Sequence, residues 1–250
     1  MLSAVLLPLA FWVITVPAAL HGTNVTGWAI NEKLAGIGQI AFTTSLYFDT
    51  HAKITDQDVA FLAQTAYDDL NEIMKNYNQK DYGAFDKPAH VALVAKGKAF
   101  YLASTIRRRV GYGAWNPPKT NDAVRTALYQ CQARIISESQ VKQPANCAEA
   151  MAMHLYYSAN PDKKDDSLGK DVTLVVYGQG DGDKNPRVLK PCQAKPAKPE
   201  STDISGWASA IGCQNLVDKM GVKVYEGKVD MDSDRGKHLM GILRQRKVCV

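Results

Sequence analysis

The chain has 250 residues, of which 46% are hydrophobic and 22% charged, and its formal net charge is +5. This composition argues against wholesale disorder and fits one large globular domain or two small ones. The positive excess is mild, so it permits nucleic-acid binding but gives no argument for it.

The N-terminal run MLSAVLLPLAFWVITVPAAL is apolar and uncharged, and polar residues follow it. It approaches the length of a membrane span, but two prolines interrupt it. Small residues flank Pro17, as at signal-peptide cleavage sites. We therefore predict a secretory signal peptide over residues 1–18, cut near Ala18. A retained anchor is the alternative, because a basic n-region is missing.

Export is also favoured by the sequon Asn24-Val25-Thr26, which predicts glycosylation of Asn24. No later segment is apolar enough to span a bilayer. The expected protein is therefore secreted and has no stable membrane association once the signal peptide is removed.

Residues 19–54 are predicted to form a lead-in to the main domain, with a possible strand in QIAFTTSLYF. A long amphipathic helix is expected to follow, because apolar residues recur on one face of ITDQDVAFLAQTAYDDLNEIMKNYN. Thr55 is its predicted cap, and Asp58, three residues on, completes an approximate capping box.

A β-hairpin and a second helix are expected next. Two apolar runs, 91–95 and 99–103, flank the sequence KGK, which is a hairpin signal. The second helix is predicted to start at an Asn121 cap and to run to about Arg134.

The following segments alternate between helix and strand. Pro144 prevents a helix from extending back, so a helix is expected from an Asn146 cap, with Cys147 at or near its first position. VTLVVYG is a near-continuous β-branched run and predicts a buried strand. A short helix opened by Cys213 and the strand VKVYE complete the series.

This alternation predicts a layered α/β fold. The predicted domain spans residues 55–226, with a Lys/Pro-rich insertion over 193–211. Residues 227–250 are interpreted as a C-terminal tail that holds a helix around HLMGILRQRK.

Three cysteines stand at positions suited to metal binding. Cys147 and Cys213 open helices, and Cys192 ends a loop behind a proline. Helix N-termini favour thiolates, which are zinc ligands. Three protein ligands leave a fourth position for a water whose pKa zinc lowers. Glu149, near the same helix tip as Cys147, is placed to move a proton from that water to a leaving group.

These residues resemble the motifs H/C-A-E and P-C-x-x-C of the zinc-dependent cytidine deaminase-like superfamily, in a secreted toxin or effector form. The matching elements are Cys147-Ala148-Glu149, Pro191-Cys192 and Cys213. The resemblance covers roughly residues 55–226 and includes the order helix, hairpin, Cys-led helix, strand, Cys-led helix, strand. It implies an α-β-α sandwich with a mixed central sheet.

The same resemblance implies a function. Cys147, Cys192 and Cys213 correspond to the zinc ligands, and Glu149 to the glutamate that shuttles protons. The implied reaction is hydrolytic deamination, in which zinc-activated water attacks an amino-bearing carbon of a nucleobase, nucleoside or nucleic acid.

Two features depart from the family pattern. The two-residue gap of the second motif is here twenty residues, 193–212, and an extra helix precedes the Cys-led helix. Lengthening a flexible loop several-fold costs only about 1–2 kcal/mol. Structural zinc binding is worth on the order of 10 kcal/mol, so a metal can hold the loop closed.

The five cysteines leave a second interpretation open. Exported proteins usually pair their cysteines, and a Cys192–Cys213 disulfide would stabilise the fold by roughly 3 kcal/mol. If zinc takes three cysteines instead, Cys131 and Cys249 remain for one disulfide. The alternative function is a catalytically inactive, secreted interaction or effector protein stabilised by disulfides.

Two further motifs receive structural interpretations. His154, about two turns after Cys147, is interpreted as a core or surface residue and not as a ligand. DMDSDRG, from Asp230 to Gly236, has Arg235 where a calcium loop needs glycine, so a calcium site is not predicted.

Overall fold

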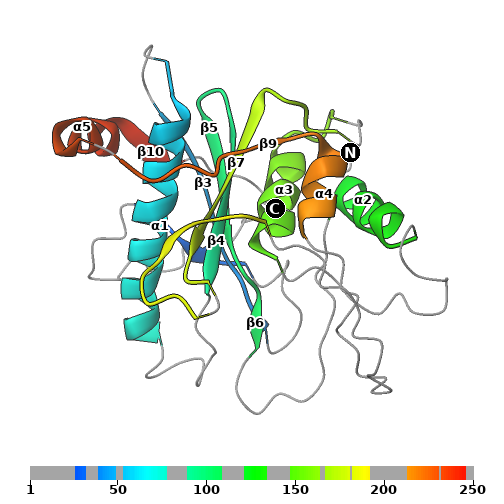
Figure 1. Cartoon of the computed structure of the whole chain (residues 1–250), viewed down its shortest axis with the longest axis horizontal. Coiled ribbons are helices and arrows are strands. Elements are labelled where there is room, and N and C mark those ends of the chain that lie inside the picture. Colours follow the sequence, from blue (N-terminus) through cyan, green and yellow to red (C-terminus); the bar gives the residue numbers. More distant parts are fainter. Residues whose placement is uncertain are drawn as a thin grey trace, which may run out of the picture.

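The computed structural model describes residues 26–31, 39–48, 53–77, 89–108, 121–133, 147–163, 167–180, 182–191, 213–230 and 232–245. In these residues helices lie on both faces of a largely antiparallel β-sheet (Figure 1). The fold is therefore mixed α/β, as the alternating sequence pattern predicts.

The helices are α1 (Asp56–Tyr77), α2 (Asp122–Ala133), α3 (Ala148–Ala159), α4 (Cys213–Met220) and α5 (Ser233–Ile242). The strands are β1 (Ala29–Ile30), β2 (Gln39–Ile40), β3 (Phe42–Phe48), β4 (His90–Lys96), β5 (Ala99–Ser104), β6 (Arg107–Arg108), β7 (Val172–Gly178), β8 (Arg187–Leu189), β9 (Lys223–Val224) and β10 (Leu243–Gln245).

The main sheet has the strand order β1-β3-β5-β4-β7-β8, and each neighbouring pair in this order is antiparallel. The short strand β9 pairs with the first half of β7 in parallel, which makes the sheet mixed. β10 pairs with β3, and β2 and β6 form a separate two-stranded sheet.

The predicted hairpin is confirmed as β4 and β5, which pair from Val91 opposite Ser104 to Lys96 opposite Ala99. Gly97 and Lys98 form the two-residue turn, and Gly97 has a φ of 59°. Tight hairpin turns need such left-handed backbone, which glycine adopts without steric cost.

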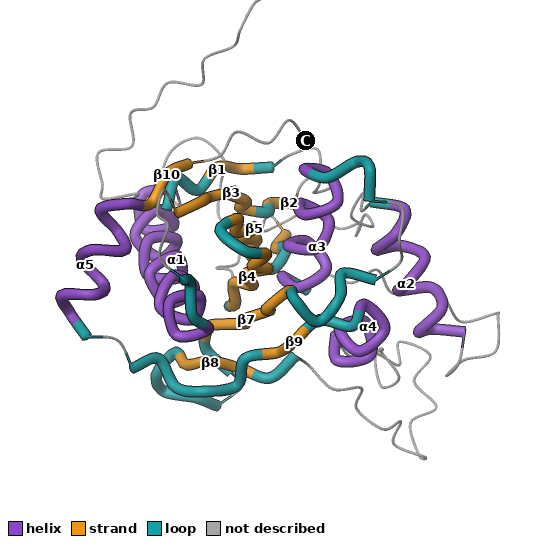
Figure 2. Tube along the Cα trace, turned by 90° about the horizontal axis from the view of Figure 1, so that it is seen from above, coloured by secondary structure: helices purple, strands orange, loops and turns teal. Residues whose placement is uncertain are grey.

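Two separate layers of side chains pack against the sheet. Alternate residues of a strand face opposite sides, so Val91 and Leu93 of β4 pack with the α1 layer, whereas Ala92 and Val94 pack with α3. Seen from above, α1 and α5 cover one face of the sheet, and α2, α3 and α4 cover the other (Figure 2).

Both predicted helix caps in the first half of the chain are confirmed. The Oδ2 of Asp58 accepts hydrogen bonds from the backbone N–H and the hydroxyl of Thr55, and the N–H of Asp58 donates to Thr55 Oγ1. The Oδ1 of Asn121 accepts from the N–H of Ala123 at 2.8 Å and caps α2.

The lead-in and the tail contribute strands to the same sheet. The strand predicted in residues 39–48 is confirmed in its larger part as β3, which lies inside the sheet beside β5, whereas β2 is a separate strand that pairs with β6. Asp69 of α1 accepts hydrogen bonds from the N–H and the hydroxyl of Thr26, both at 2.8 Å. The tail adds α5 and β10, and β10 pairs with β3.

An ion pair ties the tail to the start of α1. The carboxylate of Asp58 is fully buried, and the half-exposed guanidinium of Arg235 donates to both of its oxygens, at 2.7 and 2.6 Å. Burial alone would raise the pKa of Asp58, but the hydrogen bonds from Arg235 and Thr55 outweigh it and lower the pKa. The pair therefore stabilises the fold at neutral pH, and this contribution is lost as the pH falls below the ordinary carboxyl range.

We predict that Asp58→Ala lowers the free energy of unfolding by about 3 kcal/mol, because it removes both a capping box and a buried ion pair. Urea denaturation monitored by circular dichroism measures this loss. Asp234→Ala, at an exposed position of α5, is the matched control and should leave the midpoint almost unchanged. Equal midpoints for the two variants would contradict the structural role of Asp58.

Candidate functional site

The start of α3 is the centre of the candidate site. Cys147 is the N-cap of this helix, with extended backbone (φ −70°, ψ 138°), and its side chain makes no capping hydrogen bond. The helix itself begins at Ala148. Cys147 thus takes the N-cap position that the sequence analysis assigned to Asn146, so that assignment is wrong by one residue; Asn146 itself lies outside the described residues.

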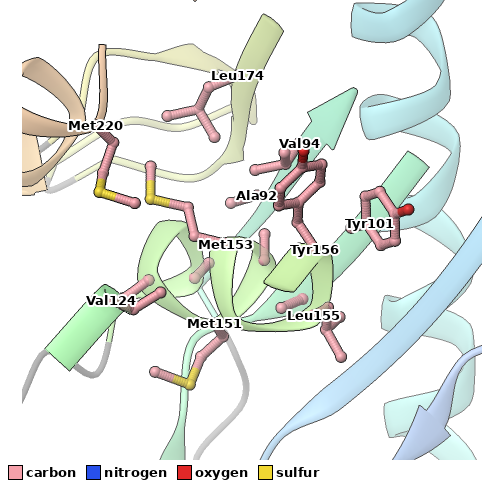
Figure 3. Packing of buried hydrophobic residues seen from close by; sticks show 14 of the residues in the cluster. Ala92, Val94, Tyr101, Val124, Met151, Met153, Leu155, Tyr156, Leu174 and Met220 are labelled. Carbon is pink, nitrogen blue, oxygen red and sulfur yellow. The ribbon is translucent and has the colours of Figure 1, made fainter. Parts of the chain in front are cut away.

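Helix α3 is buried along almost its whole length, from Ala148 to Tyr157. A helix that is apolar on every side belongs in the interior of a protein. Figure 3 shows the side chains around it: Ala92, Val94 and Tyr101 from the hairpin, Val124 from α2, Leu174 from β7 and Met220 from α4. The position of its first turn is therefore set by packing from several elements at once.

Glu149 is a buried carboxyl in this first turn, and only 5% of the residue is exposed. Burial raises the pKa of Glu149 from 4.5 to about 7, and a hydrogen bond from its own backbone N–H opposes the rise in part. A buried carboxyl that exchanges its proton near neutral pH has the property that general acid–base catalysis requires.

The helices α3 and α4 start at the same end of the sheet. Leu168, just before β7, donates its N–H to the carbonyl of Met220, the last residue of α4. Lys96, opposite the first residue of β7, donates to the hydroxyl of Tyr156 near the end of α3. Both helices therefore end beside the start of β7, and both begin toward its carboxyl end (Figure 1).

Cys147 is half-buried and forms a disulfide. Its partner lies outside the side chains that the structure describes. The other cysteines are distributed as follows: Cys131 and Cys213 belong to α2 and α4 without described side chains, and Cys192 and Cys249 lie outside the described residues. Among described residues, no three His, Cys, Asp or Glu side chains gather as metal ligands do.

His154 is buried in the middle of α3 and ties this helix to α2. Its Nδ1 accepts a hydrogen bond from the backbone N–H of Asn121 at 2.6 Å, and its Nε2 lies 3.3 Å from Ser158 Oγ. Burial lowers the pKa of His154 to about 4, so the ring is neutral at pH 7 and Nε2 carries the proton. Of the two interpretations that the sequence left open, core or surface, the structure shows that His154 is a core residue.

The motif from Asp230 to Gly236 is structural in its described residues. Asp232 caps α5 by accepting from the N–H of Asp234 at 2.8 Å, and Arg235 pairs with Asp58. Arg235, which stands where a calcium loop needs glycine, thus forms the ion pair that joins α5 to α1.

Comparisons with known proteins returned no relative: neither a protein-family model, nor a curated protein, nor a solved structure matches this chain. Within the described ranges, each helix is too short or too polar to cross a bilayer. Asn24 and residues 1–18 lie outside those ranges, so the predicted glycosylation site and signal peptide remain predictions.

We predict that Glu149 makes stability fall as pH rises. Between about pH 4.5 and 7 the native state holds a proton that the unfolded chain has released, so the free energy of unfolding drops by about 3 kcal/mol across this window. Glutamine cannot ionise, so Glu149→Gln should gain about that much relative to wild type between pH 4 and pH 8. Urea denaturation of the metal-free, unreduced protein measures this; a difference that does not change with pH would contradict the burial of Glu149.

His154 gives the opposite dependence. Between pH 6.5 and about 4 the unfolded chain binds a proton that native His154 does not, so stability falls by about 3 kcal/mol as the solution is acidified. His154→Asn keeps an acceptor near the position of Nδ1 and should lose this dependence. Glu149 titrates over nearly the same range with the opposite sign, so the readout is the difference in unfolding free energy between His154→Asn and wild type at each pH. Denaturation between pH 7 and pH 4 should show this difference shifting by about 3 kcal/mol in favour of the variant on acidification; His238→Asn, on the exposed side of α5, is the control. A difference that does not change with pH would show that His154 is not the titrating group.

Proposed function

We propose that the chain adopts the cytidine deaminase-like fold and that its thiol form is a secreted, zinc-dependent deaminase-like hydrolase. One observation carries the proposal: α3 and α4 begin at the same end of the sheet. Cys147 and Glu149 lie at the start of α3, and Cys213 lies at the start of α4. This arrangement supports a site to which two residues 66 positions apart in the chain, Cys147 and Cys213, would both contribute.

The order of the described elements supports the same proposal. Helix α1, the β4–β5 hairpin, α3, β7, α4 and β9 follow one another in the order on which the resemblance rests. The extra helix α2 does not interrupt this arrangement, because it packs against α3 and α4 on the side away from the sheet (Figure 2). The extra helix, which departs from the family pattern, is therefore an addition to the helical layer.

Zinc binding at these cysteines depends on their redox state. A sulfur in a disulfide is not a thiolate and does not bind zinc as one, so the disulfide form of Cys147 does not fit the metal. With Cys147 reduced, Cys147, Cys192 and Cys213 offer three thiolates, a set that zinc accepts while keeping one position open. Zinc bound there would supply a Lewis acid and a water of lowered pKa.

The protein's own contribution in this proposal is the buried carboxyl of Glu149. It lies two residues from Cys147 in a turn fixed by packing, and it is shielded from bulk water. Its role is to carry a proton to the departing amine while water adds to the amino-bearing carbon. The balance is hydrolytic: a ring carbon loses NH₂ as ammonia and gains a carbonyl oxygen. The substrate class is a nucleobase, a nucleoside or a nucleic acid.

A second function is favoured by the disulfide itself. A disulfide at Cys147 fits an oxidising compartment, as the predicted signal peptide does. If this bond is permanent, the chain is a catalytically inactive, secreted interaction or effector protein that retains the fold. The two proposals differ in whether Cys147 is ever a thiol in the working protein.

The activity test is ammonia release by the reduced, zinc-supplied protein from free bases, nucleosides, and single-stranded DNA or RNA. We expect Glu149→Gln to lower turnover by at least about 10²-fold, because the proton carrier is lost, while the zinc content stays unchanged. Glu226→Gln, at an exposed carboxylate that pairs with Lys190, is the matched control. Turnover in Glu149→Gln equal to that of wild type would remove Glu149 from its assigned role.

A further inference from the structure

We propose that α2 is a flap that acid releases from α3 and α4, and that His154 is the group that triggers the release. The change is confined to the helical layer: α2 opens while α3 and the sheet stay folded. This opening needs neither a metal nor the disulfide of Cys147, so it goes beyond the proposed function.

Helix α2 belongs to the outside of the helical layer. It packs against α3 and α4, on the side of these helices away from the sheet (Figure 2). The described side chains of α2 that are buried are Val124 and Ala127, which join the core cluster around α3. Because an outer helix with few buried side chains opens at a lower free-energy cost than the core, α2 can leave without unfolding the sheet.

A hydrogen bond joins the start of α2 to the middle of α3. The backbone N–H of Asn121 donates to Nδ1 of His154 at 2.6 Å, and the Oδ1 of Asn121 caps α2 by accepting from Ala123. The Nε2 of His154 lies 3.3 Å from Ser158 Oγ. Nδ1 accepts only while it carries no proton, so protonation of His154 would set two N–H groups against each other.

Burial makes that protonation costly while α2 is in place. His154 is 9% exposed, and burial lowers its pKa from 6.5 to about 4. Release of α2 would expose the ring to water and return its pKa toward the ordinary value, so protons favour the released state. Between pH 7 and pH 4 the ratio of released to packed α2 should therefore rise by about 100-fold.

Charged groups near α3 offer little compensation for a protonated His154. Glu149, on the same helix, has its pKa raised to about 7 and is therefore neutral in the acid range. The described titratable or charged side chains on α3 and on the elements that pack against it are otherwise Tyr156 and Tyr157 on α3, Asp122 and Arg125 on α2, Asp218 and Lys219 on α4, His90 and Lys96 on β4, Tyr101 on β5 and Tyr177 on β7. Those on α2 and α4 are exposed, so water screens their charges. His90 and Lys96 can add only positive charge, and the tyrosine hydroxyls carry no charge in acid.

Hydrogen exchange of the full chain, without added metal or reductant, tests the flap at pH 7, 5 and 4. Mass spectrometry compares peptides from α2 with peptides from α3 and β5, and each rate is divided by the intrinsic rate at that pH. We expect the protection of α2 to fall by about 100-fold between pH 7 and pH 4. At pH 4 it should be at least about tenfold lower than the protection of α3.

Two variants make the test specific to His154. In His154→Asn the side-chain amide keeps an acceptor for the N–H of Asn121 and takes up no proton in this range. The fall in α2 protection should therefore shrink to less than about threefold. His238→Asn, at an exposed position of α5, is the matched control and should keep the wild-type fall.

Three outcomes would overturn the proposal. Equal protection of α2 and α3 at every pH would show that the two helices open together. Protection of α2 that does not change between pH 7 and pH 4 would show that acid does not release it. A fall that persists in His154→Asn would show that another group drives the release. The first two outcomes are read from the wild-type protein, so they stand even if His154→Asn does not fold.

Discussion

Burial of α3 on all sides is the constraint on which the rest of this structure depends. The helix fills the space between the β4–β5 hairpin and the neighbouring helices α2 and α4. Because its register is fixed by packing, a carboxyl two residues from the cap is held out of water, and the cap residue itself is held at the edge of the core. The unusual pKa of Glu149 is a consequence of that placement.

The elements on the other face of the sheet stabilise this arrangement without entering the site. Two lead-in residues bind to helix α1. The N–H of Thr26 donates to the carboxylate of Asp69, and the Nε1 of Trp28 donates to the carbonyl of Ala66 at 2.7 Å. The tail binds to the same helix through the ion pair between Arg235 and Asp58. The lead-in strand β3 then pairs with β5, and β5 packs directly on α3. Segments far from Glu149 in sequence thus support the hairpin on which its helix rests.

Local features of the fold were predictable from the sequence, and long-range polar contacts were not. The hairpin turn at Gly97, the Thr55 capping box and the Asn121 cap each involve residues within a few positions, so their patterns are visible in the chain. Thr26–Asp69, Asn121–His154 and Asp58–Arg235 join residues 43, 33 and 177 positions apart. No sequence periodicity marks such pairs.

The candidate site was predictable in part. The sequence indicates a cysteine and a glutamate at a helix start. The run AEAMAMHLYY is almost entirely apolar, and a helix that is apolar on all sides is buried, so this composition indicates the burial of Glu149 although the periodicity does not. The bond made by Cys147 was not predictable, because disulfide connectivity does not follow from spacing. The proposed ligands Cys192 and Cys213 depend on chain segments whose side chains the structure does not describe.

The central claim is that sulfur atoms distant in sequence meet at the tip of α3, beside the carboxyl of Glu149. X-ray absorption at the zinc edge, on the reduced and zinc-loaded full chain, tests this most directly. The account predicts three sulfur neighbours at about 2.3 Å and one oxygen at about 2.0 Å. A zinc shell of nitrogen and oxygen atoms without sulfur would contradict it.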